Sequence, residues 1–269
     1  MAGPYHGKDG LISYCGSAVA SITSWSFSTS IDIAGTTAMG STNSWETQRA
    51  GLSDFSGSCE ALANSGASLF PIDGSDGSLE FFFSNSDATV GFEGNAIGTG
   101  ITETVSQDDV GKVSVSFEGN DAAGLAVGDI TDDVILATPF HGKRGGVVWN
   151  SEEMPSTNEW SISLTCDTAD STSMDMANYG RTRLAGFKAA TASWSCLARS
   201  DGFATQAGTA IALGDSKTLA LSRNLSDSAT GYYTGTARIT GMDMSNDARG
   251  ITTATYSAKF DGKVTFATA

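Results

Sequence analysis

The sequence is poor in residues that interrupt strands, bind metals or attract nucleic acid. Of its 269 residues, four are proline, four are cysteine and two are histidine, and 30 acidic residues face 15 basic ones. The net charge of −15 argues against a basic nucleic-acid groove. No apolar run approaches the roughly 20 residues that span a bilayer, and the N-terminal segment lacks the apolar core of a signal peptide. We therefore expect a chain made and kept in a cytoplasm-like compartment, with no membrane partner.

Motifs for catalysis or cofactor binding are also missing. The sequence contains no G-x-S-x-G, H-E-x-x-H or phosphate-loop pattern. The segment 73–77 resembles part of a calcium loop but lacks the later bidentate glutamate, so a turn is expected there. The four cysteines show no C-x-x-C spacing and are interpreted as small core residues: Cys15, Cys59, Cys166 and Cys196. We expect no enzyme, no cofactor and no metal site.

What the sequence does contain is abundant glycine, serine and threonine around strand-like runs. The 32 glycines with frequent Ser and Thr favour strands joined by tight turns, so an all-β fold is predicted. Residues 20–33 alternate in polarity as a strand does, whereas 34–48 lack periodicity and predict a long exposed loop. Further strands are expected at 50–63, 78–83, 88–106, 110–119, near 146, and at 156–167, 185–198, 217–223, 230–244 and 250–260. A short helix or a turn is expected at 64–70, and a short helix at 202–213 in the second copy.

The sequence repeats itself at a step of 135 residues. Four landmarks hold this step, namely Tyr5-His6-Gly7-Lys8 with Phe140-His141-Gly142-Lys143, Trp25 with Trp160, Ala50-Gly51 with Ala185-Gly186, and Leu62-Ala63 with Leu197-Ala198. Later the second copy is longer, and Phe117-Glu118-Gly119 resembles Phe260-Asp261-Gly262. Insertions that fall among turn residues are tolerated in surface loops. The chain is therefore predicted to be two tandem β-sandwich or barrel modules, residues 1–134 and 135–269.

The repeat bears on the two histidines and on the cysteines. His6 and His141 occupy equivalent positions at the head of each copy, which favours a structural turn over a catalytic base. The cysteines do not repeat, as expected of residues that are not ligands.

The ordered series of repeated residues resembles the major tail tube proteins of long-tailed bacteriophages. It consists of Tyr5-His6-Gly7-Lys8-Asp9-Gly10, Ser24-Trp25-Ser26-Phe27, the run 50–58, the run 94–101 and the run 113–119. The resemblance implies modules of two packed sheets with a flanking helix and a long loop. It also implies six-fold rings with a continuous inner barrel, stacked into a tube for DNA ejection. With two modules in each chain, a ring would need three chains.

By the same resemblance, the long loops 34–48 and 168–183 would form the contacts between stacked rings. The candidate contact residues are Thr36, Met39, Trp45, Arg49, Met174, Tyr179, Arg181 and Arg183. The implied partners are copies of the chain, other tail and head–tail connector proteins, and phage DNA that passes through the lumen without specific binding. The implied location is the virion tail, assembled in the host cytoplasm.

Charge is divided unequally between the copies. Residues 1–134 hold 18 acids and three bases, whereas residues 135–269 hold 12 of each. An acidic lumen would let DNA slide, which leads to the hypothesis that Glu103, Asp108 and Asp109 face the channel. Arg181, Arg183 and Lys188 would then meet acids of neighbouring subunits. The alternative is that these acids face solvent.

Other functions use similar compositions. A capsid decoration or head–tail joining protein would also be β-rich, acidic and poor in cysteine. A tandem carbohydrate-binding module would need exposed aromatic rings, but Trp25, Trp160 and Trp194 lie within strand patterns, which leaves Trp45 and Trp149 as candidates. Contractile tails and secretion-system tubes use the same fold, and the sequence does not separate them.

Overall fold

The regular structure is almost entirely antiparallel strand, as expected. The computed structural model describes residues 10–15, 17–18, 21–35, 48–63, 74–82, 91–121, 126–128, 142–154, 156–173, 180–197, 211–226, 231–245 and 253–267. In these ranges one helical element, a turn of 3-10 helix at Gly142–Arg144, accompanies a 16-stranded sheet. The predicted helix at 64–70 and most of that at 202–213 lie outside the described residues.

The strands follow the chain in two similar series. The first comprises β1 (Leu11–Tyr14), β2 (Ser17–Ala18), β3 (Ile22–Gly35), β4 (Gln48–Leu62), β5 (Asp76–Phe82), β6 (Gly91–Ser106), β7 (Lys112–Gly119) and β8 (Ala126–Gly128). The second comprises β9 (Gly146–Trp149), β10 (Glu152–Glu153), β11 (Thr157–Asp170), β12 (Arg183–Leu197), β13 (Ser216–Ser222), β14 (Tyr232–Ser245), β15 (Thr253–Phe260) and β16 (Thr265–Ala267).

Each half folds around one long strand that belongs to two layers. In the first half, the beginning of β6 pairs with β5 and β8, and its later part pairs with β7. β14 does the same in the second half with β13, β16 and β15. Glycines at bulges, Gly98–Gly100 in β6 and Gly241 in β14, mark the passage from one layer to the other.

The two halves share their strand registers. Ile22 pairs with Ala61 as Thr157 pairs with Cys196, a step of 135 on both strands. Both hairpins carry bulges at the same two places, and residues with positive φ recur at the same step in Ser21 and Ser156. Because residues 129–141 lie outside the described part and the halves share one sheet, the module boundary at 134/135 stays a prediction.

The later strands correct the sequence alignment of the copies. Ala96 pairs with Gly119 as Ala237 pairs with Phe260, so Phe260 corresponds to Gly119 and not to Phe117. The step there is 141 residues, because the second half is five residues longer between β12 and β13 and one longer between β13 and β14. The shared phenylalanine placed the copies two residues out of register.

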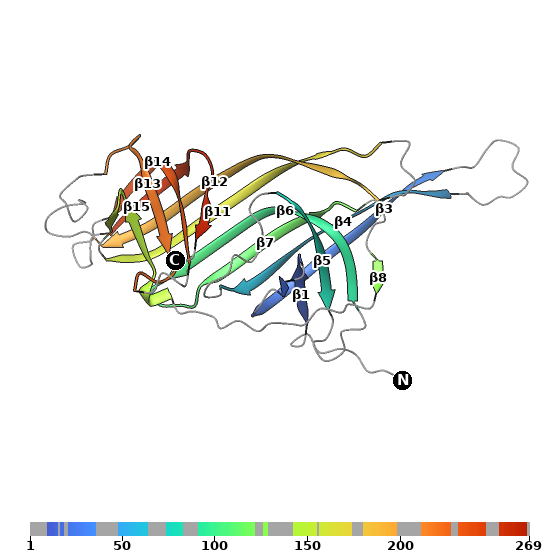
Figure 1. Ribbon diagram of the computed structural model, residues 1–269, viewed down its shortest axis with the longest axis horizontal. Coiled ribbons are helices and arrows are strands. Elements are labelled where there is room, and N and C mark those ends of the chain that lie inside the picture. The colour runs from blue at the N-terminus through green and yellow to red at the C-terminus, as the bar shows by residue number, and fades with distance from the viewer. Residues whose placement is uncertain are drawn as a thin grey trace, which may run out of the picture.

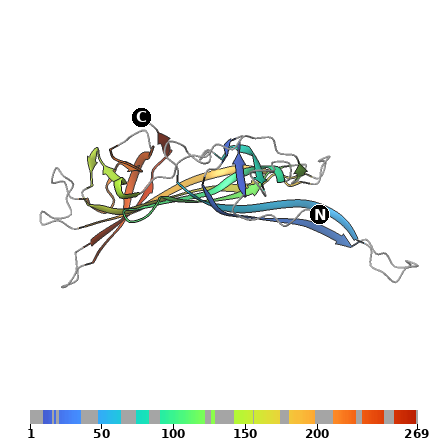
Figure 2. The same cartoon turned by 90° about the horizontal axis from the view of Figure 1, so that it is seen from below.

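A continuous sheet of eight strands runs through both halves. Its order is β3, β4, β7, β6, β11, β12, β15 and β14, and the halves meet where β6 pairs with β11. Figure 1 shows these long strands lying diagonally across the molecule, with the β3–β4 hairpin extending beyond the rest. Seen from below in Figure 2, the long sheet is a thin layer with the shorter strands of both halves on one side of it.

The hydrophobic core lies between the long sheet and these shorter strands. Its largest buried side chains include Trp160, Trp194, Tyr256, Phe81 and Phe117. The prediction of core cysteines is confirmed for Cys59, Cys166 and Cys196, whereas Cys15 is exposed at a turn. Trp149 is buried against Trp194 and is not an exposed platform; Trp45 lies outside the described residues.

The predicted long loops are shorter than expected at their described ends. β3 continues to Gly35 and β4 begins at Gln48, so both strands enter the range predicted as loop. In the second half β11 extends to Asp170 and β12 begins at Arg183. Polar residues that lack periodicity form strands here because each pairs with its partner in the hairpin.

Candidate assembly surfaces

The solvent side of the long sheet is a face of hydroxyl groups. Alternate residues of every strand point away from the core, and the cross-strand pairs bring these positions together on one face. We call this the hydroxyl face. It comprises Ser26, Ser28, Ser56, Ser58, Thr102, Thr104, Ser114, Ser116, Ser161, Ser163, Thr191, Ser193, Ser195, Ser245, Thr255 and Ser257.

Hydroxyl pairs on this face bond to one another across strands. Ser161 and Ser193 lie 2.9 Å apart through their Oγ atoms, and Ser26 and Ser58 lie 3.3 Å apart at the corresponding place in the first half. Charged side chains sit mostly toward the strand ends: Glu60, Lys112, Glu118, Glu159, Asp243 and Lys259. The middle of the face is polar and uncharged.

Within the described residues, the two ends of the long sheet are open. β3 pairs with β4 on one side and has no partner strand on the other. Residues 241–245 of β14 pair with β15, whereas β13 pairs only as far as Arg238. Exposed apolar side chains gather at these edges, among them Ile31, Ile33, Met242 and Met244. Exposed strand edges and apolar side chains together are typical of an interaction surface.

A buried ion pair joins the two halves beneath the β6–β11 pairing. Glu103 of β6 accepts hydrogen bonds from Arg223 Nε and Nη2, both at 2.7 Å, and from the Tyr233 hydroxyl at 2.6 Å. Neither Glu103 nor Arg223 is exposed to solvent. Burial opposes the charge on Arg223, but the bonds and charge of Glu103 raise its pKa. Burial, and then the charge of Glu103, raises the pKa of Tyr233 well above its ordinary value.

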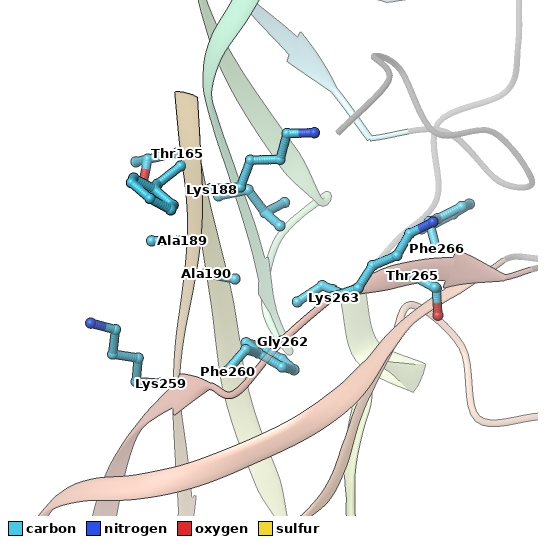
Figure 3. A pocket seen from close by; sticks show the side chains of 13 residues that line it. Thr165, Lys188, Ala189, Ala190, Lys259, Phe260, Gly262, Lys263, Thr265 and Phe266 are labelled. Atoms are coloured by element: carbon cyan, nitrogen blue, oxygen red, sulfur yellow. The ribbon is translucent and has the colours of Figure 1, made fainter. Parts of the chain in front are cut away.

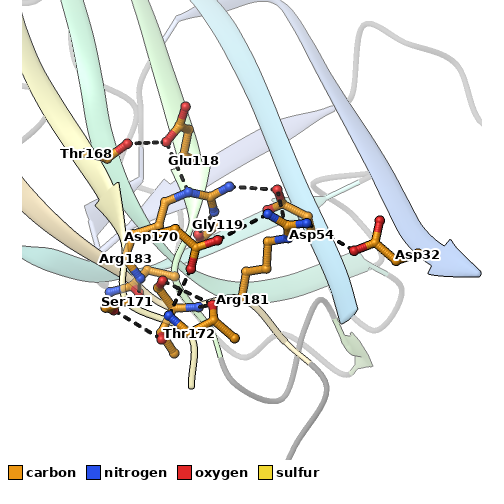
Figure 4. A network of polar contacts seen from close by, with 12 residues as sticks. Asp32, Asp54, Glu118, Gly119, Thr168, Asp170, Ser171, Thr172, Arg181 and Arg183 are labelled. Atoms are coloured by element: carbon orange, nitrogen blue, oxygen red, sulfur yellow. Dashed lines mark hydrogen bonds and ion pairs between the residues drawn. The ribbon is translucent and has the colours of Figure 1, made fainter. Parts of the chain in front are cut away.

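A second polar joint lies at the far end of β12, where two arginines reach the first half (Figure 4). Arg183 binds Asp54 at 2.7 Å and Glu118 at 3.1 Å, and it donates to the Gly119 carbonyl. Arg181 binds Asp32 at 3.0 Å and its backbone amide donates to the Ser53 carbonyl. The hydrogen bond with Asp54, against the cost of burial, raises the pKa of Arg183.

These contacts correct two of the sequence hypotheses. Glu103 does not face a channel, because its carboxylate is fully buried by the ion pair with Arg223. Arg181 and Arg183 meet acids as expected, but those acids belong to their own chain. The sequence carried one signal for these contacts within the chain, because acidic residues are in excess in the first half and the arginines that bind them belong to the second. No pattern marked Arg223 or Tyr233 as partners of Glu103.

The other predicted residues are placed as follows. Asp108 and Asp109 are exposed at the turn between β6 and β7, and Asp109 binds Lys112 at 2.7 Å. Arg49 is exposed near the start of β4. The remaining candidates lie outside the described residues: Thr36, Met39, Trp45, Met174 and Tyr179, together with His6 and His141.

A surface pocket of about 900 Å³ lies where β12, β15 and β16 meet (Figure 3). Phe187 and Phe260 contribute aromatic rings, and Lys188, Lys259 and Lys263 contribute amines. Phe187 is 89% exposed, the most open of the large apolar side chains recorded in the described ranges. Over those same ranges, no three potential metal ligands cluster and no helix is long and apolar enough to cross a membrane.

The described residues define an all-β protein whose long sheet ends in two open edges. Residues 145–266 match the family model described as phage tail tube protein. The match covers most of the second half of the chain, which is therefore similar to phage tail tube proteins, the family that the repeated motifs of the sequence resemble.

Solved structures of gene transfer agent particles are also similar to this chain. The tail of an empty particle, computed with helical refinement and C6 symmetry, is 18% identical with a TM-score of 0.36 over 48% of this chain and 98% of that one. The virion of a native particle is 17% identical with the same TM-score and coverages. No curated protein matches the chain.

Proposed function

We propose that three copies of this chain form a closed ring, and that stacked rings form the tail tube through which DNA is ejected. One observation carries the proposal: the long sheet ends in two open edges of different sequence, β3 and β14. An edge that pairs with an unlike edge makes a head-to-tail contact, which closes into a ring when the rotation permits. Two repeated halves per chain, with the six-fold rings implied by the family resemblance, give three chains.

The hydroxyl face would line the channel of such a ring. The shorter strands occupy the other side of the long sheet, so closure with the core outward leaves the hydroxyl face inward. Eight strands from each of three chains, spaced about 4.8 Å apart and tilted by about 40°, close a barrel roughly 50 Å across between backbones. That width admits a DNA duplex after side chains are allowed for.

A channel of hydroxyl groups suits DNA that must move without stopping. Phosphate binding is strong where Lys and Arg release counterions, and the middle of this face carries none. Serine and threonine exchange weak hydrogen bonds with water and phosphate alike. We therefore replace the hypothesis of an acidic lining with a neutral one, with Asp108 and Asp109 at its rim.

The test is the mass and symmetry of the assembled particle. Mass photometry of purified protein should give a species of three chains, and electron cryomicroscopy of tubes should give layers of three chains with the hydroxyl face inward. A ring of six chains, or a monomer at every concentration, would overturn the proposal. Assembly in the host cytoplasm, a purely structural role without catalysis, and contacts with connector proteins belong to the same proposal.

A further inference from the structure

The pairing of β6 with β11 inside one chain provides a template for the contact between chains. In the shared registers, β14 corresponds to β6 at a step of 141 and β3 corresponds to β11 at a step of 135. β6 and β11 are paired, whereas the matching edges of β14 and β3 have no partner strand in the described chain. We propose that β14 of one chain pairs with β3 of the next in the register of β6 with β11, an inference that rests on the proposed ring.

The template fixes which residues face one another. Within the chain Thr102 pairs with Ser163, and Ile101 pairs with Leu164. The corresponding pairs between chains are Asp243 with Ser28 and Met242 with Thr29. All four of these residues are exposed in the single chain. The first pair continues the hydroxyl face, and the second lies on the core side.

Burial differs between the halves as this contact requires. In the second half Trp160, Ile162 and Tyr233 are buried, with β6 added beside them. Their counterparts Trp25, Phe27 and Phe92 are half-buried in the first half, where no strand is added to β3. Phe27 lies against Phe92 with ring centroids 4.6 Å apart. The half-buried rings are an unfinished core that one further strand would cover.

Met244 is the residue that would complete this core. It corresponds to Glu103, the acid that enters the second half, and it is 56% exposed in the single chain. Phe27 corresponds to Ile162, the residue opposite Glu103, and Phe92 corresponds to Tyr233, which binds it. The contact within the chain is thus an ion pair. The contact between chains packs a methionine among aromatic rings, which sulfur favours.

Two long hairpins, β11–β12 and β3–β4, extend from the sheet, and we call them arms. They differ in charge at the residue that reaches the neighbouring half. On the first half Arg183 binds Asp54 and Glu118; their counterparts on the second half are Ala189 and Lys259, which line the pocket of Figure 3. The residue corresponding to Arg183 on the next chain's arm is Gln48. An arginine at this position would be repelled by Lys259, whereas the uncharged side chain of Gln48 would not. The pocket therefore receives the β3–β4 arm of a neighbouring chain. First and second halves then alternate around the ring.

Cysteine pairs test the register in the assembled protein. In a Cys15→Asn background, which takes the residue found at the equivalent turn of the second half, Ser28→Cys is combined with Asp243→Cys, and Thr29→Cys with Met242→Cys. Directly opposite residues in antiparallel strands form either hydrogen-bonded or non-hydrogen-bonded pairs. The Cα atoms of at least one kind of pair are close enough for a disulfide. Oxidation of rings should link chains covalently in at least one of these variants.

The matched controls recombine the same four positions. Ser28→Cys with Met242→Cys, and Thr29→Cys with Asp243→Cys, place the thiols on opposite faces and should not link. Rings that form normally but link in neither in-register variant, or link equally in the controls, would overturn the register while leaving the three-chain ring intact. Absence of any ring in the unmutated protein would instead count against the proposed function.

Two substitutions test the chemistry of the joint. Met244→Glu should raise the protein concentration needed for assembly by at least about tenfold, because an unpaired carboxylate would be buried among rings, whereas Met244→Leu should leave it within about threefold. Gln48→Arg should weaken assembly through Lys259, and Lys259→Glu should restore it. An unchanged circular dichroism spectrum of each monomeric variant would exclude misfolding as the cause. Assembly of Met244→Glu at the unmutated concentration, or no rescue by Lys259→Glu, would contradict the assigned partners.

Discussion

Glu103 and Arg223 form a two-pronged ion pair that is inaccessible to solvent, although 120 residues separate them in sequence. Glu103 belongs to the first half and Arg223 to the second, so the pair can form only when both halves are folded against each other. Two buried charges in one contact bring little net stability when both are present, but either is costly when left alone. We infer that the pair acts chiefly to specify how the halves dock.

Removing one member of this pair should be strongly destabilising. Glu103→Ala leaves the Arg223 guanidinium buried without its partner and should lower the free energy of unfolding by about 3–5 kcal/mol. Urea denaturation followed by tryptophan fluorescence measures the change. The control takes the residues found at the equivalent positions of the other half: Glu103→Met after Met244, Tyr233→Phe after Phe92, and Arg223→Phe after Phe83, at the step of 140 residues that relates β5 to β13. This triple variant should be more stable than Glu103→Ala, and equal losses would show that the charges themselves are not the cause.

The arginine arm should contribute less, because part of it is open to water. The Arg183 side chain is 12% exposed and contacts Asp54, Glu118 and a backbone carbonyl. Arg183→Ala should cost about 1–3 kcal/mol in the same denaturation measurement. Gln48→Ala, at the corresponding position of the other arm, should change the stability of the monomer by less than about 0.5 kcal/mol. A loss of similar size in both variants would contradict the assigned contacts.

Alkaline pH should destabilise the chain through buried groups. Burial, and then the nearby Cys196, raises the pKa of Tyr256 from 10.0 to about 12. A raised folded-state pKa contributes stability that is complete below the unfolded pKa and is lost as the pH rises toward the folded value. The free energy of unfolding should therefore fall between pH 10 and about 12. Tyr256→Phe should flatten this fall, and it should be tolerated at pH 7 because the buried hydroxyl has no hydrogen-bond partner among the described residues.

Thiol labelling should separate the cysteines by burial. Cys15 is exposed, whereas burial raises the pKa of Cys59 to about 12 and that of Cys196 to about 11. The thiolate is the reactive species, so a disulfide reagent at pH 8 should label Cys15 quickly. Cys59 and Cys196 should react only after denaturant is added. Rapid labelling of either in the native protein, read by peptide mass spectrometry, would contradict the described core.

Most of the strand pattern was predictable from the sequence because polarity alternates along it. The run 20–33 alternates apolar rings with serines, and β3 follows it within two residues at each end. The repeat step of 135 also reappears in the strand registers, since a register slip of one residue would turn every side chain to the wrong face. The match to tail tube proteins over residues 145–266 agrees with the family suggested by the repeated motifs.

The contacts between the halves were not predictable, because each joins residues far apart in sequence. Glu103 resembles any exposed acid of an alternating strand until β11 is added beside β6 and Arg223 enters from the second half. Phe117 and Phe260 look equivalent by type, yet the strand pairing places Phe260 opposite Ala237, as Gly119 is opposite Ala96. Local pattern determines the strands, and long-range pairing determines their partners.

The strict alternation across the long sheet has a consequence for errors in assembly. If β3 of a neighbour were added to β14 one residue out of register, Phe27 would turn away from the core side on which Met244 lies, and the serines of β3 would turn toward the core. Such a contact would lose both its apolar packing and its hydrogen-bonded hydroxyl row, so it would dissociate before a further chain could join. The penalty for a wrong register is thus contained in the two faces of the strand itself.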